Sequence, residues 1–252
     1  MPSSEAMFEL VGMDLYACAC HDDRLNLSGR RDHWLQQLAA ASSRRSEWGS
    51  ARSSARDSAR SPSGICSARV SSPRCQRDLA ETIAAGEPFT LVLNVIIPAA
   101  RNYSALSYFR VNSDVMRRRD DPAAALFPPW HGAPHAFPND RLKRVPRISG
   151  GSYVMQQGVG SKPVLLGKRI EVSYHPSASS FEVVINVCSN STADMITRLV
   201  RDSMASSVAL DLALTIEGRA ADELPERIVC AVRFDHLDFD CATPPPPLVP
   251  LD

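Results

Sequence analysis

The chain has 252 residues, of which 44% are apolar and 22% charged, and it balances 28 Lys and Arg against 28 Asp and Glu. This length and composition fit one large globular domain or two small ones. The zero net charge argues against nucleic-acid binding, which usually brings a basic excess, so we expect no nucleic-acid partner. No apolar stretch approaches the ~20 residues of a membrane-spanning helix.

The first third of the chain changes composition abruptly. Residues 8–16, FELVGMDLY, have the pattern of a strand, and DHWLQQLAA (32–40) could form a short helix. Residues 42–74 then hold 12 serines and 7 arginines against two acids, Glu47 and Asp57. A segment of this kind cannot bury enough apolar surface to fold, so we predict a disordered low-complexity insertion spanning about 41–86.

From Glu87 onward the pattern is that of a folded domain. A Pro- and His-rich loop is expected from Arg117 to about Asp140, and residues 176–179, PSAS, predict a hairpin turn. Alternating or continuous apolar residues predict strands at 89–98, 103–111, 151–159, 163–174 and 180–187.

The last quarter predicts a helix followed by two strands. Ile196, Val200, Met204 and Val208 recur every four residues, which indicates an amphipathic helix over about 192–208, capped by Ser191 or Thr192. Strands follow at 209–218 and 226–240, and the Pro-rich tail 243–252 is expected to be disordered. Together these elements predict an α+β fold, an antiparallel β-sheet with one long amphipathic helix packed on it.

The glycine-rich stretch GVGSKPVLLGK (158–168) raises the question of a phosphate-binding loop. That motif needs four residues between a glycine and Gly-Lys, followed by Ser or Thr. Here six residues separate Gly160 from Gly167, and Arg169 follows Lys168. We therefore interpret the stretch as a strand, a turn and a second strand, with Gly158 and Gly160 allowing unusual backbone angles.

Metal and catalytic motifs are weak in this sequence. His131 and His135 lie in a Pro-rich loop, and the cluster of Cys18, Cys20 and His21 has no familiar zinc spacing. In DHLD (235–238), strand alternation would place Asp235 and His236 on opposite sides of the strand, which argues against a hydrogen bond between their side chains. We expect no enzyme activity, no metal and no cofactor.

The seven cysteines are odd in number and irregular in spacing, and the N-terminus lacks the features of a secretion signal. Free thiols and a cytoplasmic location are therefore expected. Cys188 and Cys230 sit in apolar runs and are predicted to act as small core residues.

Basic residues gather around the central glycines. Such a group could face anionic lipid headgroups, although solvent-facing charges on strands and turns are the alternative. The headgroup-binding candidates are Lys143, Arg144, Arg147, Lys162, Lys168 and Arg169.

Several blocks, in order, resemble the Enhanced Disease Resistance 2 C-terminal domain family. The most distinctive is RLKRVPRISGGSYVMQQGVGSKPVLLGKRIEVSYHPSASSFEVVINV (141–187), and FELVGMDLY (8–16), ALDLALTIEG (209–218) and ELPERIVCAVRF (223–234) are similar too. The resemblance implies a single domain over 8–242, interrupted by the insertion. Tyr153 stands where the family usually has tryptophan, and Asn186 and Cys188 replace an acidic residue and a glycine.

In plants this domain often follows pleckstrin-homology and lipid-transfer domains, and here we expect a stand-alone member. The resemblance carries no established catalytic residues. It implies a non-enzymatic domain that binds lipid or attaches peripherally to membrane surfaces, through an apolar groove between sheet and helix with a basic rim. One alternative is a protein–protein interaction scaffold using the Pro-rich loop 128–138 and the tail. Another is a metal-dependent hydrolase using His131, His135 or the Cys18–His21 cluster.

Overall fold

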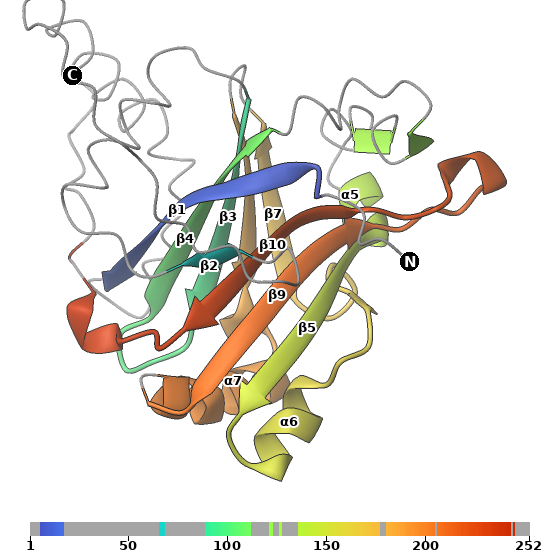
Figure 1. The fold of residues 1–252 in the computed structure, drawn as a ribbon. Helices are drawn as coiled ribbons and strands as arrows, with labels where there is room; N and C mark the ends of the chain where they lie inside the picture. Colours follow the sequence, from blue (N-terminus) through green and yellow to red (C-terminus); the bar gives the residue numbers. More distant parts are fainter. Residues whose placement is uncertain are drawn as a thin grey trace, which may run out of the picture.

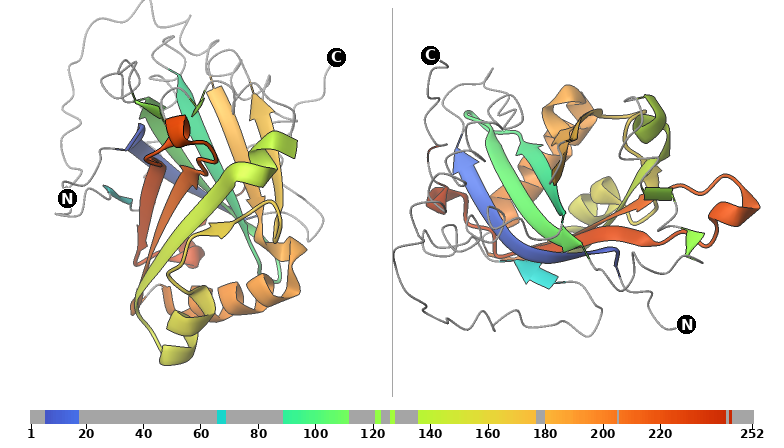
Figure 2. Two further views of the ribbon diagram at one scale, coloured as in Figure 1. Left: turned by 90° about the vertical axis from the view of Figure 1, so that its right-hand side faces the viewer. Right: turned by 90° about the horizontal axis from the view of Figure 1, so that it is seen from above.

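Two five-stranded sheets pack with their inner faces together, and two helices cross one end of the pair (Figures 1 and 2). This computed structural model describes residues 6–17, 66–68, 89–111, 121–122, 126–127, 136–176, 180–204, 206–242 and 244. The predicted mixture of strands and helices is confirmed. A single antiparallel sheet is not what forms, because the strands divide between two sheets and each sheet contains one parallel pair.

The first sheet holds strands from both halves of the chain. In spatial order it contains β1 (Phe8–Ala17), β4 (Tyr103–Val111), β3 (Thr90–Ile97), β8 (Ser180–Asn186) and β7 (Glu171–Pro176). β3 and β8 run parallel, with Leu91 opposite Phe181, and the other pairs are antiparallel. β8 is buried on both faces except at its last residue, which explains its nearly continuous apolar sequence.

The second sheet contains β2 (Cys66–Ala68), β10 (Ile228–Asp235), β9 (Val208–Ile216), β5 (Leu142–Gly150) and β6 (Val164–Leu165), in that spatial order. β2 is the described part of the predicted insertion, and it runs parallel to β10.

Strand β5, for which the sequence analysis predicted no element, contains Pro146. The backbone carbonyl of Leu142 accepts a bond from the Leu166 amide, on the side where β6 lies. Backbone groups two residues apart point to the same side of a strand, so the nitrogen of Pro146 also points toward the β6 side. β6 pairs only with Lys143 and Arg144, and Pro146 lies beyond its end. The N–H group that proline lacks is therefore not needed for a hydrogen bond to β9.

Residues 151–159, predicted as a strand, instead form the helix α6 (Tyr153–Val159). The Ser152 side chain accepts the Met155 amide at 3.4 Å, and the helix ends at Gly160, whose φ is 69°. Serine before a helix and glycine after it are its usual capping residues. These caps outweighed the strand-like apolar pattern.

The predicted long helix is α7 (Ser191–Met204), and it ends four residues early because Val208 already begins β9. Its N-terminal cap is neither Ser191 nor Thr192. The side chain of Asn190 accepts the amide of Ala193 at 3.0 Å. A third helix, α5 (Ala136–Arg141), begins inside the predicted loop, and it tolerates Pro138 because that residue lies in the first turn.

The segment 163–174 is not one strand. Val164–Leu165 joins the second sheet as β6, and Glu171 begins β7 in the first sheet. GVGSKPVLLGK is therefore a helix end, a turn, a two-residue strand and a second turn. Gly160 has the predicted unusual backbone angle, whereas Gly158 lies within α6. Gly167 fits closely against the backbone of Asn139.

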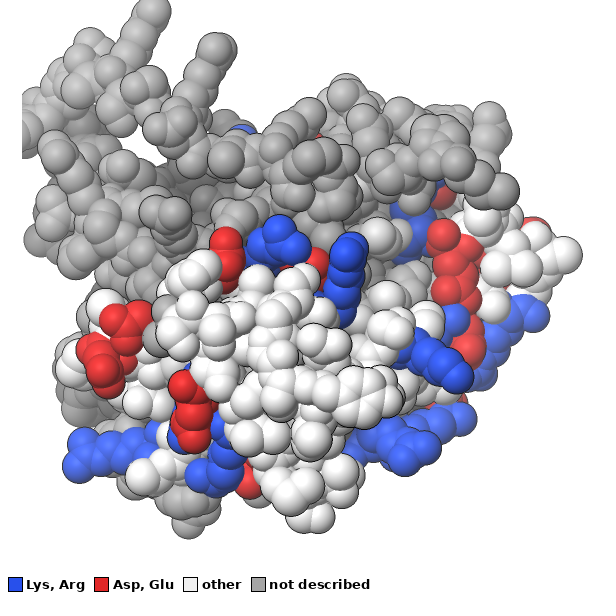
Figure 3. Space-filling model, turned by 60° about the horizontal axis from the view of Figure 1, so that its bottom comes forward, with Lys and Arg blue, Asp and Glu red and all other residues white. Residues whose placement is uncertain are grey.

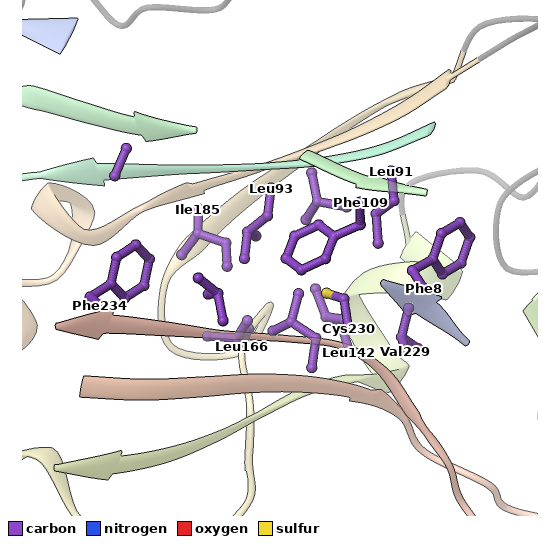
Figure 4. Packing of buried hydrophobic residues seen from close by; sticks show 14 of the residues in the cluster. Phe8, Leu91, Leu93, Phe109, Leu142, Leu166, Ile185, Val229, Cys230 and Phe234 are labelled. Atoms are coloured by element: carbon purple, nitrogen blue, oxygen red, sulfur yellow. The ribbon is translucent and has the colours of Figure 1, made fainter. Parts of the chain in front are cut away.

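Apolar side chains from both sheets meet in one core (Figure 4). Phe109 and Leu93 enter it from the first sheet, and Cys230 and Leu142 enter it from the second. Cys230 is a core residue as predicted, while Cys188 is half-buried. Among the described helices, none has the length and apolar character needed to cross a membrane.

Several predictions lie outside the described residues. They are the helix at 32–40, the Cys18–His21 cluster, His131 and His135, most of the insertion 41–86, the loop 128–135 and all of the tail 243–252 except Pro244.

We predict that Gly167→Ala lowers the free energy of unfolding by about 1–3 kcal/mol, the usual cost of overpacking. A Cβ at this position would lie 2.5 Å from the carbonyl oxygen of Asn139, an atom that belongs to the backbone and cannot swing away. Urea unfolding followed by circular dichroism measures the change. Lys168→Ala is the matched control, since its exposed side chain should cost less than about 0.5 kcal/mol. Equal effects of the two substitutions would contradict the packing role of Gly167.

Candidate functional site

An apolar cavity of about 140 Å³ lies between α7 and the inner faces of both sheets. α6 and the turn between β6 and β7 complete its wall. Apart from Arg144 and Thr197, every described residue that lines it is apolar. These residues are Val95, Ile97, Pro146, Gly158, Val159, Leu166, Ile170, Ile185, Val187, Ala193, Ile196, Val200, Met204, Leu210, Leu212, Phe234 and Leu237.

Helix α7 forms one wall of the cavity with the side chains that its periodicity predicted. Ile196, Val200 and Met204 line the cavity, because residues four apart share one face of a helix. Arg201 donates to the backbone carbonyl oxygen of Pro98 at 2.6 Å, which holds the helix against the end of β3. The predicted apolar groove between helix and sheet thus corresponds to a defined cavity.

Arg144 is the charged residue of the cavity wall. On β5, Leu142 and Pro146 are buried and flank it at two-residue spacing, so all three side chains point to the inner face. Within the described part of the chain, Arg144 makes no hydrogen bond or ion pair. Burial lowers the pKa of its guanidinium from the usual value. The strand thus places a half-buried cation in apolar surroundings.

The neighbouring cations on β5 have other positions. Lys143 points to the opposite face, where its ammonium lies 2.6 Å from Glu226 and 3.8 Å from Glu217. Arg147 is exposed on the same outer face. Arg141, at the end of α5, bonds Glu223 at 2.7 Å. Hydrogen bonds from the Arg219 amide and the Arg141 side chain lower the pKa of Glu223 to about 2.

The other three candidates lie in exposed turns. Lys162 follows α6, and Lys168 and Arg169 lie in the turn before β7. The Lys168 ammonium is 3.9 Å from Asp140. The six candidate cations therefore do not line one surface, and Arg144 alone among them borders the cavity.

The outer side of α6 and α7 carries exposed apolar side chains, which the sequence analysis did not identify. Tyr153 and Val154 on α6 are 74% and 67% exposed, and Met195 and Leu199 on α7 are 64% and 44% exposed. We call these four residues the apolar helix face. The view of this end in Figure 3 shows a broad uncharged area with basic and acidic side chains around it.

A second cluster that the sequence did not reveal is polar and lies on the outer side of the first sheet. Tyr108 donates to Asp14 at 3.1 Å, and burial together with that carboxylate raises the pKa of the tyrosine. Asn94 bonds Glu182 at 3.2 Å and accepts from Ser104 at 2.5 Å. All five residues are buried. Because most of these buried polar groups are hydrogen-bonded to one another, we assign them a structural role.

Among the described residues, no group of three or more His, Cys, Asp and Glu side chains could hold a metal ion. Burial raises the pKa of the Cys230 thiol well above its usual range, which opposes nucleophilic chemistry.

The expectation that Asp235 and His236 do not interact is wrong, because their side chains lie 2.8 Å apart. β10 ends at Asp235 and His236 has a φ of 51°, so strand alternation no longer applies. The pair is exposed to solvent.

The position of Arg144 predicts that Arg144→Met raises the free energy of unfolding by about 1 kcal/mol, since a cation without a counter-charge gives way to an apolar side chain. Lys143→Met, the adjacent substitution on the opposite face, should lower it by about 1 kcal/mol, because it removes the ion pair with Glu226. Thermal and urea unfolding measure both. A loss of stability in Arg144→Met would show that the guanidinium is satisfied in the folded protein.

Comparison with known proteins identifies one family and a plant relative. The family described as "Protein ENHANCED DISEASE RESISTANCE 2, C-terminal" matches residues 1–238. A "Protein ENHANCED DISEASE RESISTANCE 2-like" of Arabidopsis thaliana is 31% identical over 157 residues, which are 62% of this chain and 21% of that protein. The chain thus matches about a fifth of this relative's length, and no solved structure matches. The chain belongs to the Enhanced Disease Resistance 2 C-terminal domain family.

Proposed function

We propose that this domain is a non-enzymatic lipid-binding module that attaches peripherally to the cytoplasmic surface of membranes. The observation that carries this proposal is the combination of an apolar cavity with exposed apolar side chains on the same two helices. Exposed apolar groups that cluster on a surface commonly mark a site of contact with a membrane or a partner.

The two helices pack directly against each other. Gly158 of α6 packs against Ile196 of α7 so closely that a Cβ at Gly158 would lie 3.3 Å from the isoleucine side chain. Ile196 and Gly158 also line the cavity, while Tyr153 and Met195 face away from the core. The helices can therefore contact a lipid surface on one side and an apolar ligand on the other.

The chemistry of the apolar helix face suits the boundary between lipid headgroups and acyl chains. Tyr153 combines an apolar ring with a hydroxyl group, and such side chains are enriched at membrane interfaces. Met195 and Leu199 would add apolar contact, as in helices that lie in the plane of the interface.

Anionic lipid would add a modest attraction through exposed cations such as Lys162, at ~1 kcal/mol each. Lys143 would contribute little, because Glu226 and Glu217 already neutralise it. We therefore propose that apolar contact contributes more to attachment than charge does.

A regulatory role is a further part of the proposal. It is supported by the names of the family and of the Arabidopsis relative, both of which refer to disease resistance.

Co-sedimentation with vesicles tests this proposal. We expect the wild-type chain to bind phosphatidylcholine vesicles that contain phosphatidylserine, and the triple variant Y153S/M195S/L199S to bind at least tenfold more weakly. Burying one large apolar side chain contributes about 1.5–3 kcal/mol, so losing partial burial at three positions should exceed a factor of ten. The exposure of these residues in the free protein makes unfolding of the variant an unexpected outcome.

Leu224→Ser provides the matched control for this experiment. Leu224 is 49% exposed and lies in the connection between β9 and β10, which projects away from α6 and α7 (Figure 1). Its substitution should leave vesicle binding unchanged. Failure of the wild-type chain to sediment with vesicles at low salt would refute membrane attachment. The apolar helix face would then favour the alternative of a protein–protein scaffold.

A further inference from the structure

Among the described arginines and lysines of the second sheet, Arg144 is the one that lacks an acidic partner without being exposed. Lys143 is paired with Glu226 at 2.6 Å and Arg233 with Asp211 at 2.6 Å, whereas Arg147, which has no such pair, is exposed to solvent. Arg144 instead lines the apolar cavity, and among the described lining residues Thr197 is the only other polar one.

A guanidinium in this position costs stability unless an anion joins it. Removing a cation from water is expensive, and the cost is recovered only through a nearby negative charge and good hydrogen bonds. Arginine presents a planar set of five donors that matches a carboxylate with two parallel bonds. The cavity wall thus combines a site for an anionic group with space for an apolar one.

The volume limits what can enter. A cavity of about 150 Å³ in another protein admits benzene, a molecule of six heavy atoms. The cavity of about 140 Å³ found here could therefore hold a short aliphatic segment of roughly six to eight carbons. Besides Arg144, the described lining residues offer only Thr197 as a polar side chain, which disfavours sugars, nucleotides and peptides.

We propose that the cavity binds a medium-chain aliphatic carboxylic acid, with its carboxylate on Arg144 and its chain against Ile196, Val200 and Met204 of α7. This inference rests on the proposed lipid-binding function, for which it names a ligand class and an anchoring residue. It does not require a membrane, so it can be tested separately.

Isothermal titration of the full chain with octanoate, in solution without vesicles, tests the inference. We expect one site per chain and at least tenfold weaker binding in Arg144→Met. Arg147→Met is the matched control, because Arg147 lies on the same strand but is exposed on the opposite face, and it should leave affinity unchanged. Ala193→Met, which adds a longer side chain to the cavity wall, should also abolish binding while Arg144 remains.

Two further ligands test the role of the head group. Octanol should bind more weakly than octanoate to the wild type, and it should not lose affinity in Arg144→Met. Octyl phosphate that binds while octanoate does not would overturn the carboxylate assignment. Equal binding of octanoate to the wild type and Arg144→Met, or no binding of any ligand, would overturn the whole inference.

The vesicle and titration experiments have separate consequences. Vesicle binding without octanoate binding would leave the proposed membrane attachment intact and refute the inference. Octanoate binding without vesicle binding would support the inference and refute the membrane attachment. The lipid function would then be limited to binding single soluble molecules.

Discussion

The parallel pairing of β3 with β8 is the constraint on which the rest of the fold depends. Two parallel neighbours cannot be joined by a hairpin, so the chain must leave the first sheet and return. Between Ile97 and Ser180 it forms β4, passes through α5 and the second-sheet strands β5 and β6, and comes back as β7. The second sheet therefore begins as part of this crossover.

Helix α7 follows from the same arrangement. β8 belongs to the first sheet and β9 to the second, and α7 is the main element between them. The helix must cross the end of the two sheets, as Figure 2 shows. The cavity is the space that remains between the helix and the diverging sheets, and its lining comes from all three elements.

On β5, successive side chains point to opposite faces of the sheet, so neighbouring cations have different surroundings. Lys143 and Arg144 are adjacent and chemically similar, but one side chain meets two glutamates and the other meets apolar groups. Within the described part of the chain, Arg147 and Lys162 also lack an ion pair, but both are exposed to water, whereas the unpaired guanidinium of Arg144 is half-buried. Such a residue lowers the stability of the free protein, and an anionic ligand bound beside it would restore that stability.

The sequence by itself determined the family, the mixed strand and helix content, and most elements whose periodicity is long and regular. It predicted β4 to the residue, and it identified Ile196, Val200 and Met204 as the inward side of a helix, because these are local properties of a few successive residues. It missed α6, where capping by Ser152 and Gly160 outweighs an apolar run, and β5, where Pro146 is harmless only at an unpaired edge.

Only the tertiary structure decided which strands share a sheet, which cation enters the cavity and which apolar residues remain exposed. Each of these depends on contacts between residues far apart along the chain. Lys143 pairs with Glu226, and Arg144 meets side chains of the facing sheet. The helix that carries the exposed Tyr153 packs against Ile196. Local pattern sets the side on which a residue lies, but the packing of distant elements determines what it meets there.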